Sequence, residues 1–163
     1  MTIDQAPRKV TLTLPSEVEI RMERVFDAPR DLVFATFTDP ELIPEWWGPG
    51  TTVEHMDPRT GGTWTFHAPG RSGTERLVFK GDYREVTPPE RIVQTFTMDT
   101  PDGRQTHVET IEFEALGDRT RLVHTSRFDT TQQRDGVVNF GAEAGANYTW
   151  GRLEQLLARR TAA

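Results

Sequence analysis

Cysteine is absent from this sequence, which excludes disulfides, thiol nucleophiles and cysteine-based metal sites. Also missing is any run of about 18 apolar residues, so we expect no transmembrane helix. The first ten residues, MTIDQAPRKV, contain no apolar segment of the kind that a secretory signal requires. These absences favour a cytoplasmic location.

Lysine is scarce, and positive charge is nowhere concentrated. Two of the 19 basic residues are lysines, Lys9 and Lys80, and the other 17 are arginines that alternate with carboxylates. The formal net charge is −6 at pH 7. Because nucleic-acid binding depends on clustered Lys and Arg, we expect no nucleic-acid partner.

The length and composition are typical of one domain. The chain has 163 residues, of which 35% are hydrophobic and 27% are charged, enough apolar residues for a single core. We place this domain at residues 17–160. Residues 1–16 are polar and carry two prolines, and we interpret them as a loosely held tail or an added edge strand.

Alternation of apolar and polar residues predicts an antiparallel sheet. Val18, Ile20 and Met22 alternate with charged residues, which is typical of a half-buried strand. Six further strand-like segments follow, at residues 51–57, 63–67, 74–86, 91–99, 105–115 and 119–128. Turn signals separate them, including those at residues 58–62, 68–73 and 100–103. Gly81, inside the longest segment, predicts a bulge or a bend in a curved sheet.

Two short helices are predicted between the first strand and the rest of the sheet. Pro29 suits the first turn of one helix. Asp39 as N-cap and Pro40 at the first helical position predict the second. Trp46 and Trp47 end it, and we interpret them as core and hinge packing rather than as ligand-facing rings.

A proline-free stretch, residues 130–160, predicts one long amphipathic helix. One of its faces carries Ala142, Ala146, Trp150, Leu153 and Leu157. This face is small in its N-terminal half and bulky from Trp150 onward. Such a helix needs an apolar surface to cover, and the predicted sheet supplies one, so the fold class is α+β.

Five segments resemble a known family. They are FDAPRDLVFATFTDPELIPEWWGPG, DPRTGGTWTF, FKGDYREVTPPERIV, GDRTRLVHT and AEAGANYTWGRLEQLL. In this order they resemble proteins similar to the activator of the 90-kilodalton heat-shock-protein ATPase. That family lies within the SRPBCC (START-like, birch-pollen-allergen-like) superfamily. The resemblance runs from about Val18 to Leu157, and its motifs specify the fold more strongly than any chemistry.

The resemblance implies a helix-grip fold. In this fold a curved antiparallel sheet, here of about six or seven strands, holds two short helices after its first strand and a long C-terminal helix packed on its face. An often apolar cavity lies between sheet and helix, and many superfamily members hold small hydrophobic molecules there. Many family members also carry Trp at the position of Ala146 and Leu at that of Trp150. Here the bulk is exchanged, so either the core repacks or the void moves beside the small half of the helix.

The histidines are the main chemical candidates, and they lie on four different predicted strands. The spacing of His55, His67, His107 and His124 matches no metal-binding motif. His107 and Glu109 share a face with apolar residues of their strand, and His124 does so on the next. If these faces point inward, the three side chains need partners, because buried ionisable groups are costly. The alternatives are half-exposed positions, a polar ligand anchor, and a metal ligand or general base.

Strand phases suggest which side chains would line a ligand cavity. An aromatic cup with a few polar atoms is typical of a pocket for a small apolar ligand, although the same residues could form an ordinary core. The expected lining comprises Trp64, Phe66, Phe79, Tyr83, Gln94, Phe96, Met98, His107, Glu109, His124, Ala142, Ala146 and Trp150.

We therefore expect a protein that binds a small apolar or aromatic molecule, without metal or cofactor. No residue has the context of a catalytic nucleophile, so we predict no catalytic residue. The first alternative is an enzyme of the polyketide-cyclase type, in which His107, Glu109, His124 or Tyr83 moves a proton. The second is a chaperone-associated interaction module, as the family resemblance implies.

Overall fold

The fold is an eight-stranded antiparallel sheet with four helices, as given by a computed structural model that describes residues 8–70, 73–100 and 103–162. Residues 1–7 of the predicted tail and residues 71–72 and 101–102 of two predicted turns lie outside this description. The strands are β1 (Thr11–Thr13), β2 (Glu19–Phe26), β3 (Thr52–Met56), β4 (Thr63–Pro69), β5 (Arg76–Thr87), β6 (Arg91–Thr100), β7 (Gly103–Leu116) and β8 (Arg119–Arg127). The helices are α1 (Arg30–Thr38), α2 (Ile43–Trp47), α3 (Thr131–Asn139) and α4 (Ala142–Ala162).

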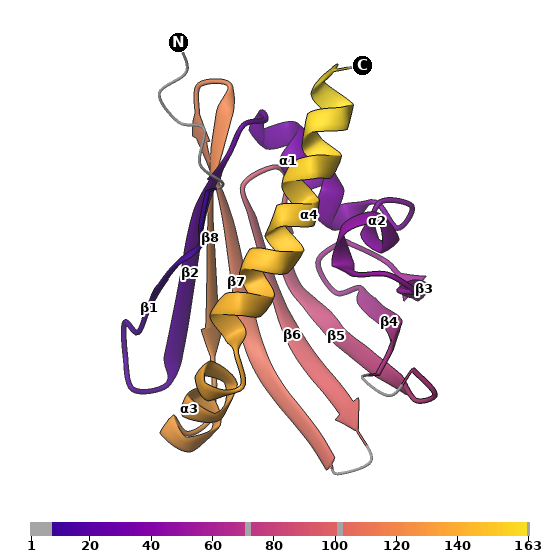
Figure 1. The fold of residues 1–163 in the computed structure, drawn as a ribbon, viewed down its shortest axis with the longest axis vertical. Helices are drawn as coiled ribbons and strands as arrows, with labels where there is room; N and C mark the ends of the chain where they lie inside the picture. The colour runs from indigo at the N-terminus through magenta and orange to yellow at the C-terminus, as the bar shows by residue number, and fades with distance from the viewer. Residues whose placement is uncertain (1–7, 71–72, 101–102, 163) are drawn as a thin grey trace.

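The strands are arranged in the order β1-β2-β8-β7-β6-β5-β4-β3. The sheet curves, and α4 crosses its concave face, with α1 and α2 beside the C-terminal half of α4 and α3 at the opposite end (Figure 1). The predicted α+β class, with a C-terminal helix on a curved antiparallel sheet, is confirmed. Among the described residues, no helix combines the length and the hydropathy that crossing a bilayer requires.

The sheet has one strand more than the predicted six or seven. The additional strand is β1, which pairs with β2 through Thr11 with Glu23 and Thr13 with Arg21. It therefore corresponds to the edge-strand alternative for the N-terminal segment. The alternation of Val10, Leu12 and Leu14 indicated this alternative, but so short a segment does not distinguish a strand from a tail, because its pairing depends on the neighbouring strand.

The irregular pairing of β5 lies near Gly81, where the sequence predicts a bulge or a bend. The register shift between β5 and β6 occurs between Tyr83 and Glu85, two residues after Gly81. Gly81 is required for a different reason, because a Cβ atom there would collide with the backbone oxygen of Thr95. The glycine thus allows the close approach of β6, and the bend follows next to it.

The short helices α1 and α2 begin at proline-containing turns, as predicted, but α2 begins later. Pro29 caps α1 with an extended backbone, and its carbonyl oxygen accepts from the amide of Val33 at 3.1 Å. Asp39 caps a turn through Oδ1, which accepts from the amide of Glu41 at 2.9 Å. This turn is not continued, and α2 starts at Ile43 rather than at Pro40.

The predicted single helix over residues 130–160 is wrong, because two helices occupy this stretch. Thr130 caps α3 by accepting from the amide of Gln133 at 3.1 Å, and α3 ends at Asn139. Gly141 then adopts a φ of +108°, a backbone conformation outside the right-handed helix, so α4 starts in a new direction. The prediction of one helix relied on the absence of proline, but a glycine with positive φ also ends a helix.

Helix α4 is held by its C-terminal half. Trp150, Leu153, Leu156 and Leu157 are buried, whereas Gly145 in the N-terminal half is exposed. The predicted apolar face is therefore confirmed for its bulky part.

Two glycine-to-alanine substitutions near the break at Gly141 should have opposite effects on the free energy of unfolding. Gly141→Ala should lower the free energy of unfolding by about 1–2 kcal/mol, because an L residue rarely adopts the φ of this position. Gly145→Ala is the matched control, since a Cβ at this helical position meets no heavy atom within 4 Å. It should stabilise by about 0.5–1 kcal/mol. Urea unfolding measures both, and a change of equal sign in the two variants would contradict this account.

Candidate functional site

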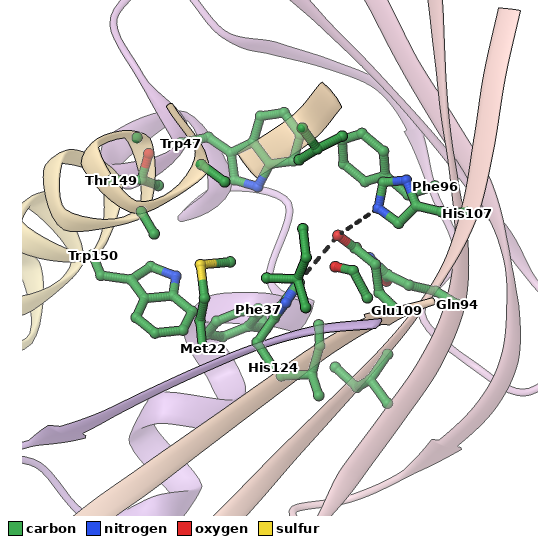
Figure 2. Close-up of a pocket in the computed structure, with 18 of the residues that line it drawn as sticks. Met22, Phe37, Trp47, Gln94, Phe96, His107, Glu109, His124, Thr149 and Trp150 are labelled. Atoms are coloured by element: carbon green, nitrogen blue, oxygen red, sulfur yellow. Dashed lines mark hydrogen bonds and ion pairs between the residues drawn. The ribbon is translucent and has the colours of Figure 1, made fainter. Parts of the chain in front are cut away.

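A pocket of about 390 Å³ lies between the concave face of the sheet and α4. Its walls come from all four helices and from strands β2 and β4–β8. Figure 2 shows some of the lining side chains, among them Trp47 of α2 and Trp150 of α4. Helix α4 contributes Ala142, Gly145, Ala146, Thr149 and Trp150. This is the small half of its apolar face together with the first bulky residue, where the sequence predicts any void to lie.

Aromatic side chains form one side of the pocket, and Trp47 lies at their centre. Its ring lies 5.0 Å from that of Phe66 and 5.4 Å from that of Phe79, both edge-on, and it stacks on Phe96 at 6.2 Å. Edge-to-face and offset contacts of this kind are favourable beyond the area they bury. Trp47 is therefore both a packing residue and a wall of the pocket.

The neighbouring Trp46 has a structural role that fits the sequence interpretation. It is buried, and its Nε1 donates to the backbone oxygen of Thr36 in α1 at 2.8 Å. This bond ties α2 to α1.

Five polar side chains meet on the inward face of the sheet, because of its register. Gln94 on β6 and Ser126 on β8 are the direct cross-strand partners of Glu109 on β7. His107 precedes Glu109 by two residues and so shares its face. His124 is the partner of Ile111, one step diagonally from Glu109, within reach of a long side chain.

Glu109 is the centre of this cluster. Gln94 Nε2 donates to its Oε1 at 2.8 Å. His107 Nε2 and His124 Nε2 lie 3.3 and 3.2 Å from its Oε2, as the dashed lines in Figure 2 mark. Since a carboxylate only accepts hydrogen bonds, the imidazole nitrogens that face it carry the protons.

Burial and the two imidazoles act in opposite directions on Glu109. The Glu109 side chain is only 10% exposed, and burial, the largest single influence, acts to raise its pKa. The charge of His124 and the hydrogen bonds from both imidazoles outweigh burial and lower the pKa well below its usual range. The site therefore presents an ionised carboxylate within largely aromatic walls.

Tyr83 and the other two histidines are not part of this cluster. Tyr83 is buried in the pocket wall, and burial, followed by the charge of Asp57, raises the pKa of its hydroxyl. His55 and His67 contact Thr63 and Glu54, at the pairing of the edge strand β3 with β4. Within the described ranges, no group of three or more His, Cys, Asp or Glu side chains is arranged to hold a metal ion.

The predicted lining residues lie around the pocket with two exceptions, Phe79 and Met98. These two are cross-strand partners on β5 and β6, two residues beyond Phe96 along β6. Phe79 instead packs beside the lining residues on the same face of the sheet, 5.7 Å from Phe96. Whether the lining residues bind a ligand stays a prediction.

Several lining residues were missed in the sequence. Met22 was recognisable, because it alternates with charged residues on β2, and its sulfur points into the pocket in Figure 2. The same alternation places five others in phase with a lining residue of their own strand: Ile20, Ile92, Ile111, Ser126 and Phe128. The rest come from helices, whose period does not indicate the distant partner. The missed residues are Ile20, Met22, Phe37, Ile43, Trp46, Trp47, Ile92, Ile111, Ser126, Phe128, Val137, Gly145 and Thr149.

The lowered pKa of Glu109 predicts a dependence of stability on pH. An ionised carboxylate with a lowered folded-state pKa stabilises the fold above its ordinary pKa of 4.5, and this contribution is lost as the pH falls below that value. Glu109→Gln should lower the free energy of unfolding at neutral pH by about 1–3 kcal/mol. The variant should also lose less stability than the wild type on acidification. Urea unfolding at a series of pH values measures both effects.

The control for this prediction is Glu114→Gln, which removes a carboxylate from the solvent-facing side of the same strand. A pH profile that changes as much in Glu114→Gln as in Glu109→Gln would show that the buried cluster is not responsible.

Comparison with solved structures supports the architecture. A protein from Mycobacterium smegmatis superposes with a TM-score of 0.83 at 20% identity, covering 93% of this chain and 99% of that one. A protein from Rhodobacter sphaeroides gives 0.81 at 21% identity, with coverages of 93% and 99%. A protein from Staphylococcus epidermidis gives 0.79 at 25% identity, with coverages of 92% and 94%. These likenesses show a shared fold, consistent with the helix grip.

Comparison by sequence identifies the family. No curated protein sequence matches the chain. The family model described as activator of Hsp90 ATPase homolog 1-like protein matches residues 27–158, which span α1 to most of α4. The resemblance seen in the sequence motifs is thereby confirmed, and the chain belongs to the family of activator of Hsp90 ATPase homolog 1-like proteins.

Proposed function

We propose that the protein binds a small, largely apolar molecule in the pocket between the sheet and α4. The observation that carries this proposal is the pocket itself, whose volume of about 390 Å³ lies within the range of known small-molecule sites. Its walls are mainly aromatic and aliphatic, with one polar cluster at Glu109. Apolar walls with a few convergent polar groups are typical of sites that bind and orient such ligands.

The position of the pocket beside small residues of α4 supports the proposal. Ala146 faces the pocket one helical turn before Trp150, and both line it. A larger side chain at this position would occupy the space that a ligand needs. The exchange of bulk relative to the family pattern therefore leaves room here, while Trp150 packs edge-on against Phe26 at 6.0 Å.

A catalytic function is the second candidate, and the contact of two imidazoles with Glu109 favours it. A carboxylate that orients an imidazole is a common arrangement for a general base. In an assay with aromatic or polyketide-like substrates, any turnover should be lost in His107→Asn and Glu109→Gln. Turnover that persists in both variants would remove the cluster from the mechanism. The chaperone partner and the cytoplasmic location stay predictions from the sequence.

Filling the pocket should abolish binding without unfolding the protein. Ala146→Trp should weaken the binding of 2-methoxynaphthalene, followed by its fluorescence, by about tenfold or more, because the new ring occupies the ligand's space. The free energy of unfolding should change by less than about 1 kcal/mol, since the ring enters a void.

The matched control is Ala144→Trp, which places the same ring on the exposed side of α4. It should bind the probe as the wild type does. Overpacking of about 1–3 kcal/mol in Ala146→Trp, or equal binding by the two variants, would contradict the proposed function.

A further inference from the structure

The polar cluster has more acceptor capacity than its own contacts use. An ionised carboxylate offers about four lone-pair positions to hydrogen-bond donors. In Glu109, Oε2 lies close to two imidazole nitrogens, at 3.2 and 3.3 Å, and Oε1 accepts from Gln94 at 2.8 Å. One acceptor position on Oε1 therefore has no donor among these contacts. A buried charged oxygen with a free lone pair gains from any donor that a ligand brings.

The residues beside Glu109 can complete the environment of a ligand hydroxyl group. Ser126 lies directly across from Glu109 on β8, is buried, and lines the pocket. Gln94 lies across from it on β6, and its amide has a second N–H. A hydroxyl that donates to Glu109 Oε1 thus has donors on either side for its own oxygen. The row Gln94–Glu109–Ser126 forms what we call the hydroxyl subsite.

Other polar groups fit this subsite less well. A carboxylate ligand has only acceptor oxygens, so it cannot donate to Oε1, and the imidazole N–H groups that could receive it already face Oε2. An ammonium carries three N–H donors and a charge, and largely apolar walls leave most of these without acceptors. An ether or a hydrocarbon leaves the lone pair of Oε1 unused. A single neutral O–H on an apolar skeleton matches both the one free acceptor and the surrounding walls.

Resting on the proposed function of the pocket, we propose that Gln94, Glu109 and Ser126 form a subsite that selects apolar ligands carrying a neutral hydroxyl group, such as a phenol or an alcohol, and rejects carboxylic acids. His107 and His124 act as positioning residues in this subsite. Their contacts with Oε2 hold the carboxylate in place and leave Oε1 for the ligand. The aromatic walls around Trp47 receive the apolar part.

Three probes with one skeleton test this selectivity: 2-naphthol, 2-methoxynaphthalene and 2-naphthoate. Their dissociation constants are measured by fluorescence titration near neutral pH, where 2-naphthol is neutral. A hydrogen bond to a charged acceptor should make 2-naphthol bind roughly ten- to hundredfold more tightly than the methyl ether. The carboxylate should bind most weakly. Equal binding of naphthol and ether, or tightest binding of the carboxylate, would overturn the subsite.

Glu109→Gln identifies the residue responsible. The advantage of 2-naphthol over the ether should shrink to about threefold or less. An advantage that survives the substitution would overturn the role of Glu109. Circular dichroism reports whether the variant folds, and if it does not, the comparison of the three probes on the wild type still decides. Failure of all three probes to bind the wild type would instead contradict the proposed function, and the subsite with it.

Discussion

The burial of one half of α4 is the constraint on which the rest of the molecule depends. Leu153 and Leu157 are fully buried, and Arg152 Nη2 donates to the backbone oxygen of Glu45 at 3.0 Å, so this half is held by both core and α2. Because a helix is stiff, fixing its C-terminal half sets the distance between its N-terminal half and the sheet. The residues there are too small to reach across that distance, and the pocket is the space that remains.

The charge of Glu109 depends on two opposing effects, desolvation by burial and pairing with polar neighbours. A lone carboxylate among aromatic rings would be neutralised rather than remain charged. Glu109 keeps its charge because two histidines and one glutamine from three strands converge on it, through the register of the sheet. Removing Glu109 takes this partner from Gln94, His107 and His124 at once, so the cluster acts as a unit. The position of these polar side chains is therefore set by the pairing of β6, β7 and β8, and not by a loop.

Alternation and turn signals were enough to predict the fold class and most strands, and to place His107, Glu109 and His124 on faces shared with apolar residues. They did not decide whether those faces point inward. They failed where the environment of a residue depends on a partner distant in sequence. Arg24 follows Met22 on the inward face of β2, yet it is buried, with its guanidinium 4.7 Å above the ring of Phe26 and 3.5 Å from Glu154. Trp47 became a pocket wall only because α2 packs beneath α4. Alternation in a sequence indicates which face of an element a residue occupies. A void depends instead on the distance between two packed elements, here the sheet and α4.

The break at Gly141 separates two helices beside the pocket that differ in how easily they open. It divides the chain over the pocket into α4, anchored in the core, and α3, in which no residue is buried. Val137 of α3 nevertheless lines the pocket. With so little buried surface, α3 opens at a small free-energy cost, whereas moving α4 requires exposing the core. Local unfolding of α3 therefore removes one wall of the pocket while α4 and the core stay folded.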